Sequence, residues 1–201
     1  MLAVSKGHPA SAIRLLAELG QRDFGESRSQ EALPKLESLG DLKCLQWHFI
    51  GRLQANKVRP VVRSFSVIHS VNSLALAERI SRIAGEEKRS PSLMLQVKLR
   101  DDPTKVGMDP EVLKEIFPSL INLPNLKIIG LMTMAPFSLS LLQRREMFFE
   151  CRDLANHLGL QDCSMGMSHD WVEAAAAGAT WLRLGSVLFG ERPNKVQSNH
   201  R

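Results

Sequence analysis

The sequence predicts a single α/β domain folded as a (β/α)8 TIM barrel. Short apolar segments alternate with longer amphipathic segments eight times along 201 residues, at roughly 25 residues per repeat. This alternation favours parallel strands, because each intervening helix returns the chain to the same end of the sheet. An open doubly wound sheet is the alternative, but no GxGxxG motif follows the first strand. We place the domain at residues 1–192 and a polar tail at 193–201.

The predicted strands are short runs rich in branched or aromatic residues and bounded by glycine, proline or polar turns. The first run begins at Met1, which indicates either a truncated chain or a late start. The last two runs end in small polar residues, at Ser168 and beyond Leu184. The expected strands span 2–4, 23–26, 45–51, 67–71, 93–97, 126–131, 163–168 (a short strand with the loop that follows it) and 181–184.

Helices are predicted between these strands, where apolar residues recur at helical spacing. Gly20 is placed to end the first helix, and Pro110 to begin the fifth. Pro34 and Pro60 fall inside expected helices, where they remove a backbone donor. The expected helices span 10–20, 27–39, 53–64, 74–84, 110–120, 139–158 and 169–177.

Composition excludes several classes of protein. With 44% hydrophobic and 23% charged residues, the chain has the composition of an ordinary globular protein. The net charge of +5 is spread along the chain, so it suits an anionic ligand better than nucleic acid. Three cysteines without a CxxC motif argue against a disulfide framework and a metal site, and favour the cytoplasm. No apolar run is long enough to span a membrane.

Lys6 is the first candidate for chemistry, because it follows the apolar run 2–4 directly. The carboxyl ends of barrel strands are where sites are built. Desolvation there disfavours an ammonium ion, so the amine can be neutral near pH 7 and attack an aldehyde. The alternative is a solvated surface charge. The other end of the chain favours the functional interpretation.

The loops after the last two expected strands are candidates for phosphate binding. One contains Ser164, Gly166, Met167 and Ser168, and the other Arg183, Gly185 and Ser186. Glycine lets the backbone approach an anion closely, and the neighbouring hydroxyl adds a donor. Small polar residues are also common in ordinary turns. Combined with Lys6 on the adjoining first strand, however, the two loops predict a site for pyridoxal 5′-phosphate.

The same segments carry a resemblance to a known family. The chain resembles the pyridoxal-phosphate homeostasis proteins, which are single-domain relatives of the alanine racemase N-terminal barrel. The similarity extends from Leu2 to about Arg192. It is carried by Leu2-Ala3-Val4-Ser5-Lys6, Phe24-Gly25-Glu26, Gln30-Glu31-Ala32, Trp47-His48-Phe49-Ile50-Gly51, Leu53-Gln54, Asn56-Lys57, Ser164-Met165-Gly166-Met167-Ser168 and Arg183-Leu184-Gly185.

The resemblance implies that Lys6 forms a Schiff base with the cofactor. It further implies that the 164–168 loop and Gly185-Ser186 hold the phosphate, while Arg183 approaches the pyridine nitrogen or the phosphate. His48 and Asn56 are carried over only as supporting residues, and for His48 a satisfied core histidine is the favoured interpretation. Two departures are expected to matter: no helix precedes the first strand, and Ser27 stands where many relatives have asparagine.

Three functions follow as hypotheses. The first is a non-enzymatic, cytoplasmic and monomeric protein that stores, delivers or protects pyridoxal phosphate, with transfer to apo-enzymes as a further expectation. Racemisation in the related fold needs a tyrosine from a second domain, and this chain contains no tyrosine. The second is a small enzyme acting on amino acids, with Lys6 as its sole base. The third, a nucleic-acid-binding module, has only the +5 charge in its favour.

Overall fold

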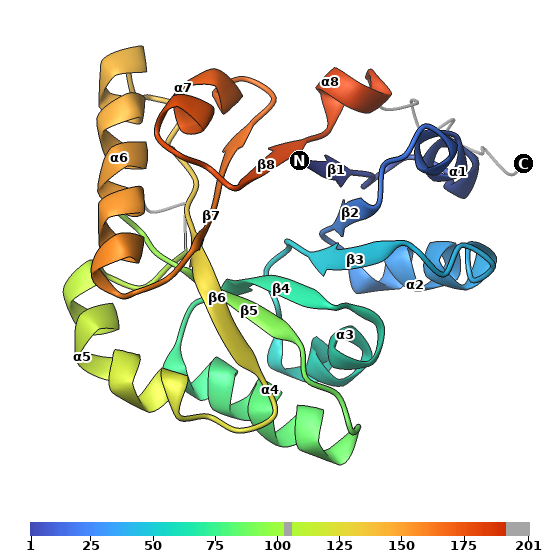
Figure 1. Cartoon of the computed structure of the whole chain (residues 1–201), viewed down its shortest axis with the longest axis horizontal. Helices are drawn as coiled ribbons and strands as arrows, with labels where there is room; N and C mark the ends of the chain where they lie inside the picture. The colour runs from blue at the N-terminus through green and yellow to red at the C-terminus, as the bar shows by residue number, and fades with distance from the viewer. Residues whose placement is uncertain (103–105, 192–201) are drawn as a thin grey trace, which may run out of the picture.

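The computed structural model describes residues 1–102 and 106–191. Eight parallel strands pair in chain order and close into a barrel, with β1 hydrogen-bonded to both β2 and β8. The helices surround this ring of strands, as Figure 1 shows. The predicted fold class is therefore confirmed. The predicted tail at 193–201 lies outside the described residues.

The observed elements follow the predicted order closely. The strands are β1 (Leu2–Val4), β2 (Asp23–Glu26), β3 (Gln46–Phe49), β4 (Val67–Val71), β5 (Ser92–Gln96), β6 (Lys127–Met132), β7 (Asp162–Met167) and β8 (Trp181–Leu184). The helices are α1 (Ala10–Glu18), α2 (Ser29–Ser38), the 3-10 turn η1 (Ala55–Lys57), α3 (Val58–Ser64), α4 (Leu74–Glu86), α5 (Pro110–Ile121), α6 (Leu141–His157), α7 (Trp171–Ala176) and α8 (Ser186–Phe189).

Side-chain caps fix where three of the longer helices begin. The Ser73 hydroxyl accepts a hydrogen bond from the backbone N–H of Leu76 at the start of α4. At α5, the Asp109 carboxylate accepts from a first-turn N–H, and Pro110 supplies a preset φ. The start of α6 is a capping box, in which Ser140 and Gln143 each accept from the other's backbone N–H. These local signals explain why the helix starts were predictable.

The observed helices differ from the prediction in several places. The segment 53–64 is divided into η1 and α3, and Pro60 lies in the first turn of α3, where its missing N–H costs no intrahelical bond. The helix expected from residue 169 begins instead at Trp171. Asp170 precedes it, with its carboxylate bonded back to the N–H of Met167 at 2.6 Å. Finally, α8 directly follows β8 and was not among the predicted helices.

The hydrophobic core lies between the ring of strands and the helices. Phe148 of α6 and Leu131 of β6 are fully buried in its larger part. A smaller cluster around Phe24 and Ile13 joins α1 to β1 and β2. Among the described residues, no helix combines the length and apolar character needed to cross a lipid bilayer. The core thus fixes eight strands whose carboxyl ends meet at one rim.

Candidate functional site

A pocket of about 550 Å³ opens at the rim formed by the carboxyl ends of the strands. This volume is within the range of small-molecule sites. Most of the lining residues come from the two ends of the sequence, because β8 closes the barrel against β1. The lining comprises Val4, Lys6, His8, Ser27, Ile50, Met134, Phe137, Met167, Ser168, His169, Arg183, Gly185, Ser186, Gly190 and Glu191.

Most of the predicted site residues meet in this pocket. Its lining includes Lys6 from the loop after β1 and Arg183 from β8. The lining residues that were predicted from sequence are Lys6, Met167, Ser168, Arg183, Gly185 and Ser186. Ser164 and Gly166 do not line it, because β7 continues to Met167. The prediction that the loop begins at Ser164 is therefore corrected: the loop begins after Met167.

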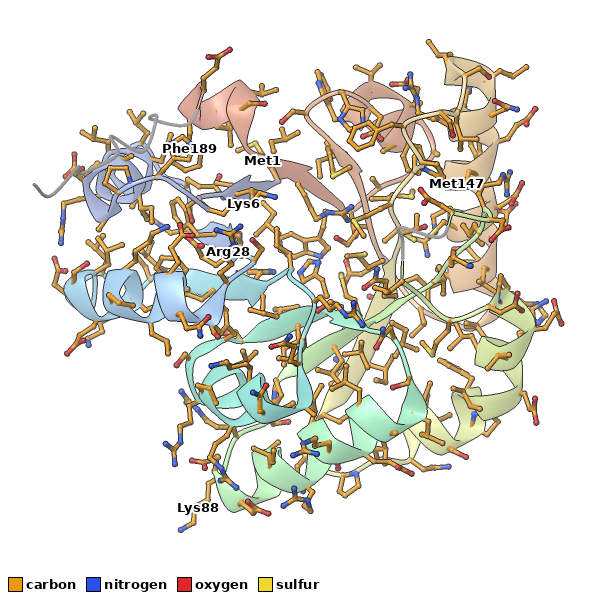
Figure 2. The ribbon with its side chains drawn as sticks, turned by 180° about the vertical axis from the view of Figure 1, so that it is seen from behind. Met1, Lys6, Arg28, Lys88, Met147 and Phe189 are labelled. Carbon is orange, nitrogen blue, oxygen red and sulfur yellow. The ribbon has the colours of Figure 1, made fainter. Side chains whose placement is uncertain are left out.

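The backbone on both sides of Lys6 is held by polar contacts. Before it, the carbonyl oxygen of Ser5 accepts a hydrogen bond from Lys35 Nζ at 3.0 Å. After it, the N–H of Gly7 donates to Glu31 Oε1 at 2.5 Å. Gly7 adopts a φ of 80°, a conformation that glycine reaches without strain. Lys6 is thus mounted on a fixed turn after β1, in the part of the ring next to β8 (Figure 2).

A buried ion pair between Lys35 and Glu26 lies next to the turn that carries Lys6. Glu26 is fully buried at the end of β2, and its Oε1 accepts from Lys35 Nζ and from Ser5 Oγ, both at 2.8 Å. Burial raises the pKa of Glu26, while the hydrogen bonds from Lys35 and Ser5 oppose that rise. Partial burial also acts to raise the pKa of Glu31, but hydrogen bonds from Lys35 and the Gly7 N–H bring it below its ordinary value. Lys35 therefore holds two carboxylates beside the Lys6 turn.

Arg183, on β8, is a second cationic group that lines the pocket. Its side chain is buried, with Nη1 donating to the carbonyl oxygen and to Oγ of Ser164 at 2.6 and 2.8 Å. Nη2 donates to the carbonyl oxygen of Thr133 at 2.9 Å. Burial lowers the pKa of Arg183 to about 10, so the guanidinium remains charged at neutral pH. A guanidinium only donates hydrogen bonds, so this group suits an acceptor or anion.

The loop after β7 and the start of α8 form one connected wall of the pocket. Asp170 closes the loop, because its Oδ1 accepts from the N–H of Met167 and its own N–H donates to the Met167 carbonyl. The backbone N–H of Gly185 donates a hydrogen bond to Ser168 Oγ at 3.3 Å. Hydroxyl and backbone N–H groups at such a position suit a phosphate.

Several lining residues escaped the sequence analysis. His8 stacks on Phe189 with ring centroids 4.8 Å apart, which joins the β1 loop to α8. Phe137 stacks on His169 at 4.9 Å on the other side of the opening. Ser27, noted from sequence only as a departure, also lines the pocket. The stacked pairs join residues far apart in the chain, so no local pattern could have revealed them.

The two supporting residues carried over by resemblance differ in their placement. His48 is fully buried inside the barrel and hydrogen-bonded to His69, which agrees with a satisfied core histidine. Asn56 is exposed on η1 and does not line the pocket. The structure therefore brings neither side chain to the pocket wall.

Replacing Gly166 with alanine is expected to destabilise the protein by about 2–5 kcal/mol. Gly166 has a φ of 86°, which costs an L-residue about 1–2 kcal/mol, and a Cβ there would lie 2.5 Å from Ala174 Cβ on α7, an overlap worth about 1–3 kcal/mol more. Gly159 is the matched control, with a φ of 69° and open space around its Cβ position. Urea unfolding should show a clearly larger loss for Gly166→Ala than for Gly159→Ala; equal losses would contradict the α7 contact.

Comparison with known proteins agrees with this geometry. The alanine racemase N-terminal domain family matches residues 2–193. The pyridoxal phosphate homeostasis protein of Synechocystis sp. is 48% identical over 198 residues, which cover 96% of this chain and 91% of that protein. The homeostasis protein of Escherichia coli K12 is 36% identical, over 96% of this chain and 85% of that protein.

Solved structures show the same relationship. PipY of Synechococcus elongatus PCC7942, solved with pyridoxal phosphate bound, superposes with a TM-score of 0.90 at 49% identity, over 94% of this chain and 92% of that chain. Alanine racemase of Clostridium difficile 630 shares the fold, with a TM-score of 0.73 at 17% identity, over 96% of this chain and 52% of that chain. With its closed barrel, its lysine after β1 and this extent of identity, the chain belongs to the pyridoxal phosphate homeostasis protein family.

Proposed function

We propose that this chain binds pyridoxal 5′-phosphate in the pocket at the strand carboxyl ends and serves its homeostasis as a store, carrier or protector. The observation that carries the proposal is that Lys6, Arg183 and the Ser168–Gly185 wall line one pocket. These groups are an amine, a fixed cation and a hydroxyl-rich wall, and they match the aldehyde, the ring nitrogen and the phosphate of the cofactor. PipY, at 49% identity, was solved with pyridoxal phosphate bound.

The residues take separate roles in this proposal. The bound cofactor supplies an aldehyde that condenses with a primary amine and releases water. Lys6 provides that amine from its fixed turn. Ser168, Gly185 and Ser186 hold the phosphate, beside Met167, and Arg183 donates toward the ring. Ser164 and Gly166 act indirectly: Ser164 holds the Arg183 guanidinium, and Gly166 lets α7 pack against β7.

We further propose that the protein is not an enzyme. A second base on the far side of a substrate is needed for racemisation, and the 201 residues include no tyrosine to supply it. Relatives at 36–48% identity are named homeostasis proteins. A cytoplasmic location, a monomeric state, delivery to apo-enzymes and a single domain over residues 1–192 complete the proposal. The three free cysteines, Cys44, Cys151 and Cys163, suit a reducing compartment.

Borohydride reduction tests the proposal directly. Purified protein is mixed with pyridoxal phosphate, reduced with borohydride and analysed by intact mass and peptide mapping. We expect one phosphopyridoxyl group per chain, located on Lys6. A chain without added mass, or with the label spread over surface lysines, would refute the site. Turnover of a panel of amino acids by the loaded protein would instead favour the small-enzyme hypothesis.

A further inference from the structure

A chain of buried polar side chains crosses the interior of the barrel and ends at Arg183. Each member comes from a different strand, and His48, His69 and Ser164 are fully buried. Asp23 Oδ1 lies 3.1 Å from His48 Nε2, His48 Nδ1 lies 2.9 Å from His69 Nε2, and His69 Nδ1 lies 2.8 Å from Ser164 Oγ. Ser164 Oγ in turn accepts from Arg183 Nη1 at 2.8 Å. No role in the proposed function uses the two histidines.

The hydrogen bonds of this chain can run in only one direction that satisfies every donor. Ser164 Oγ accepts from Arg183, and in the described part of the protein the one acceptor left for its own proton is His69 Nδ1. His69 must then carry its proton on Nε2 and donate to His48 Nδ1. His48 consequently carries its proton on Nε2 and donates to the Asp23 carboxylate. Burial, with the nearby His48 and Arg183, keeps the pKa of His69 well below its ordinary value, which agrees with a neutral ring.

The two ends of the hydrogen-bonded chain differ in their surroundings. Asp23 is the first residue of β2 and keeps 26% of its side chain exposed. Arg183, near the carboxyl end of β8, lines the pocket. A carboxylate at one end and a guanidinium at the other are joined by neutral groups whose dipoles all point the same way. Such an arrangement stabilises both charges and opposes any flip of a ring in between.

Packing further restricts the rings. Trp181 at the start of β8 lies against both histidines, with centroid distances of 4.8 Å to His48 and 6.4 Å to His69. Its own Nε1 donates to Asp162 Oδ1 at 3.2 Å, which fixes the indole. Trp181 therefore restricts the movement of both imidazoles on the side that faces β8. The orientation of Ser164 Oγ, and through it of the Arg183 guanidinium, is set by this packing.

We infer that His48 and His69 are positioning residues for the cofactor pocket, and that their hydrogen-bonded chain from Asp23 to Ser164 holds Arg183 in one orientation. The inference rests on the proposed function for the identity of the ligand. It adds a connection that the proposed function does not contain: Asp23, which begins β2 and does not line the pocket, helps to set the orientation of a cation that does line it. Substitutions at Asp23 should therefore change the absorption band of the bound cofactor.

The first test uses the protein without cofactor. Nitrogen-15 NMR of the imidazoles distinguishes protonated from unprotonated ring nitrogens. We expect His69 to be neutral at pH 7, and both His48 and His69 to carry a proton on Nε2 and to accept at Nδ1. A charged His69, or one with its proton on Nδ1, would overturn the inference, because Ser164 could not then donate toward it.

The second test measures the dissociation constant and the absorption band of bound pyridoxal phosphate. His69→Leu removes the acceptor of the Ser164 hydroxyl, so Ser164 Oγ is no longer fixed against Arg183. Binding should weaken roughly tenfold or more, with a shifted band. His69→Gln, which has both a donor and an acceptor, should restore most of the binding. Asp23→Leu alters the remote end and should shift the band in the same direction. His157→Leu, an exposed histidine on α6, is the control.

The outcomes separate the inference from the function on which it rests. If His69→Leu and Asp23→Leu both fold and both bind pyridoxal phosphate with the wild-type dissociation constant and absorption band, the inference is wrong. The proposed function is then unaffected. If His69→Leu does not fold, Asp23→Leu decides, because its side chain is partly exposed at the barrel end. A wild-type protein that binds no cofactor would overturn the proposed function and this inference together.

Discussion

Replacing Lys6 with alanine is expected to abolish the covalent adduct with pyridoxal phosphate completely. Lys6 is the lysine among the pocket-lining residues, and no other lysine lines that pocket in the described parts of the chain. Lys35, which lies close by in the structure, already donates to Ser5, Glu26 and Glu31. The measurement is the visible absorption band of the mixture, followed by borohydride reduction and intact mass. Both the band and the added mass should disappear.

Non-covalent binding should survive this substitution in weakened form. The wall formed by Ser168 and Gly185, with Arg183 beside it, does not depend on the Lys6 amine. Equilibrium dialysis should therefore still detect the cofactor on Lys6→Ala, with a higher Kd. Lys127→Ala is the control, since Lys127 is exposed at the start of β6, at the opposite rim. A Lys6→Ala protein that keeps its label would show that another amine carries the cofactor.

The fold could be predicted from sequence because the strands of a closed parallel barrel are buried on the core side and bounded by turn residues. The run Leu2–Val4 and its following lysine are adjacent in sequence, so strand and candidate amine were found together. Ser168, Gly185 and Ser186 were found for the same reason, because they follow β7 or β8 directly, and Met167 is the last residue of β7. The signal in each case is local.

The rest of the site depends on contacts that no local pattern contains. Ser164 pairs with Trp181, whereas Met167 pairs with Arg183, so β7 uses one more residue than β8 between these pairs. This bulge, with Gly166 at a positive φ, decides which β7 side chains face the interior, and alternation along the strand could not show it. The bond between His69 and Ser164 spans 95 residues of sequence. Only the closed barrel brings such residues together.

Replacing Lys35 with methionine is expected to destabilise the fold by about 3–5 kcal/mol at pH 7. Lys35 keeps 11% of its side chain exposed and Glu26 none, so the substitution leaves a buried carboxylate without its cation. Glu26 Oε2 already has no hydrogen-bond partner among the described residues, which limits any compensation. Chemical unfolding measures the loss. Because Lys35 also holds Ser5 and Glu31 beside Lys6, we expect slower adduct formation as well.

The pH dependence of this loss has a definite sign. The raised pKa of Glu26 gives a contribution to stability that is present at low pH and lost as pH rises through the folded-state value. The lowered pKa of Glu31 gives a contribution to stability that is present at neutral pH and lost as pH falls. Removing Lys35 raises both pKa values, so the deficit of the variant should grow between about pH 4 and pH 7.

A second substitution separates the buried charge from the loss of packing. In Lys35→Met combined with Glu26→Gln, the side chain beside Ser5 is neutral, so most of the lost stability should return and the pH dependence should flatten. If Lys35→Met alone lowers the free energy of unfolding by less than about 1 kcal/mol, the Lys35–Glu26 pair contributes no more than a surface ion pair. In that case the Lys6 turn would depend on Gly7 and Glu31 instead, and Glu31→Gln would become the more damaging change.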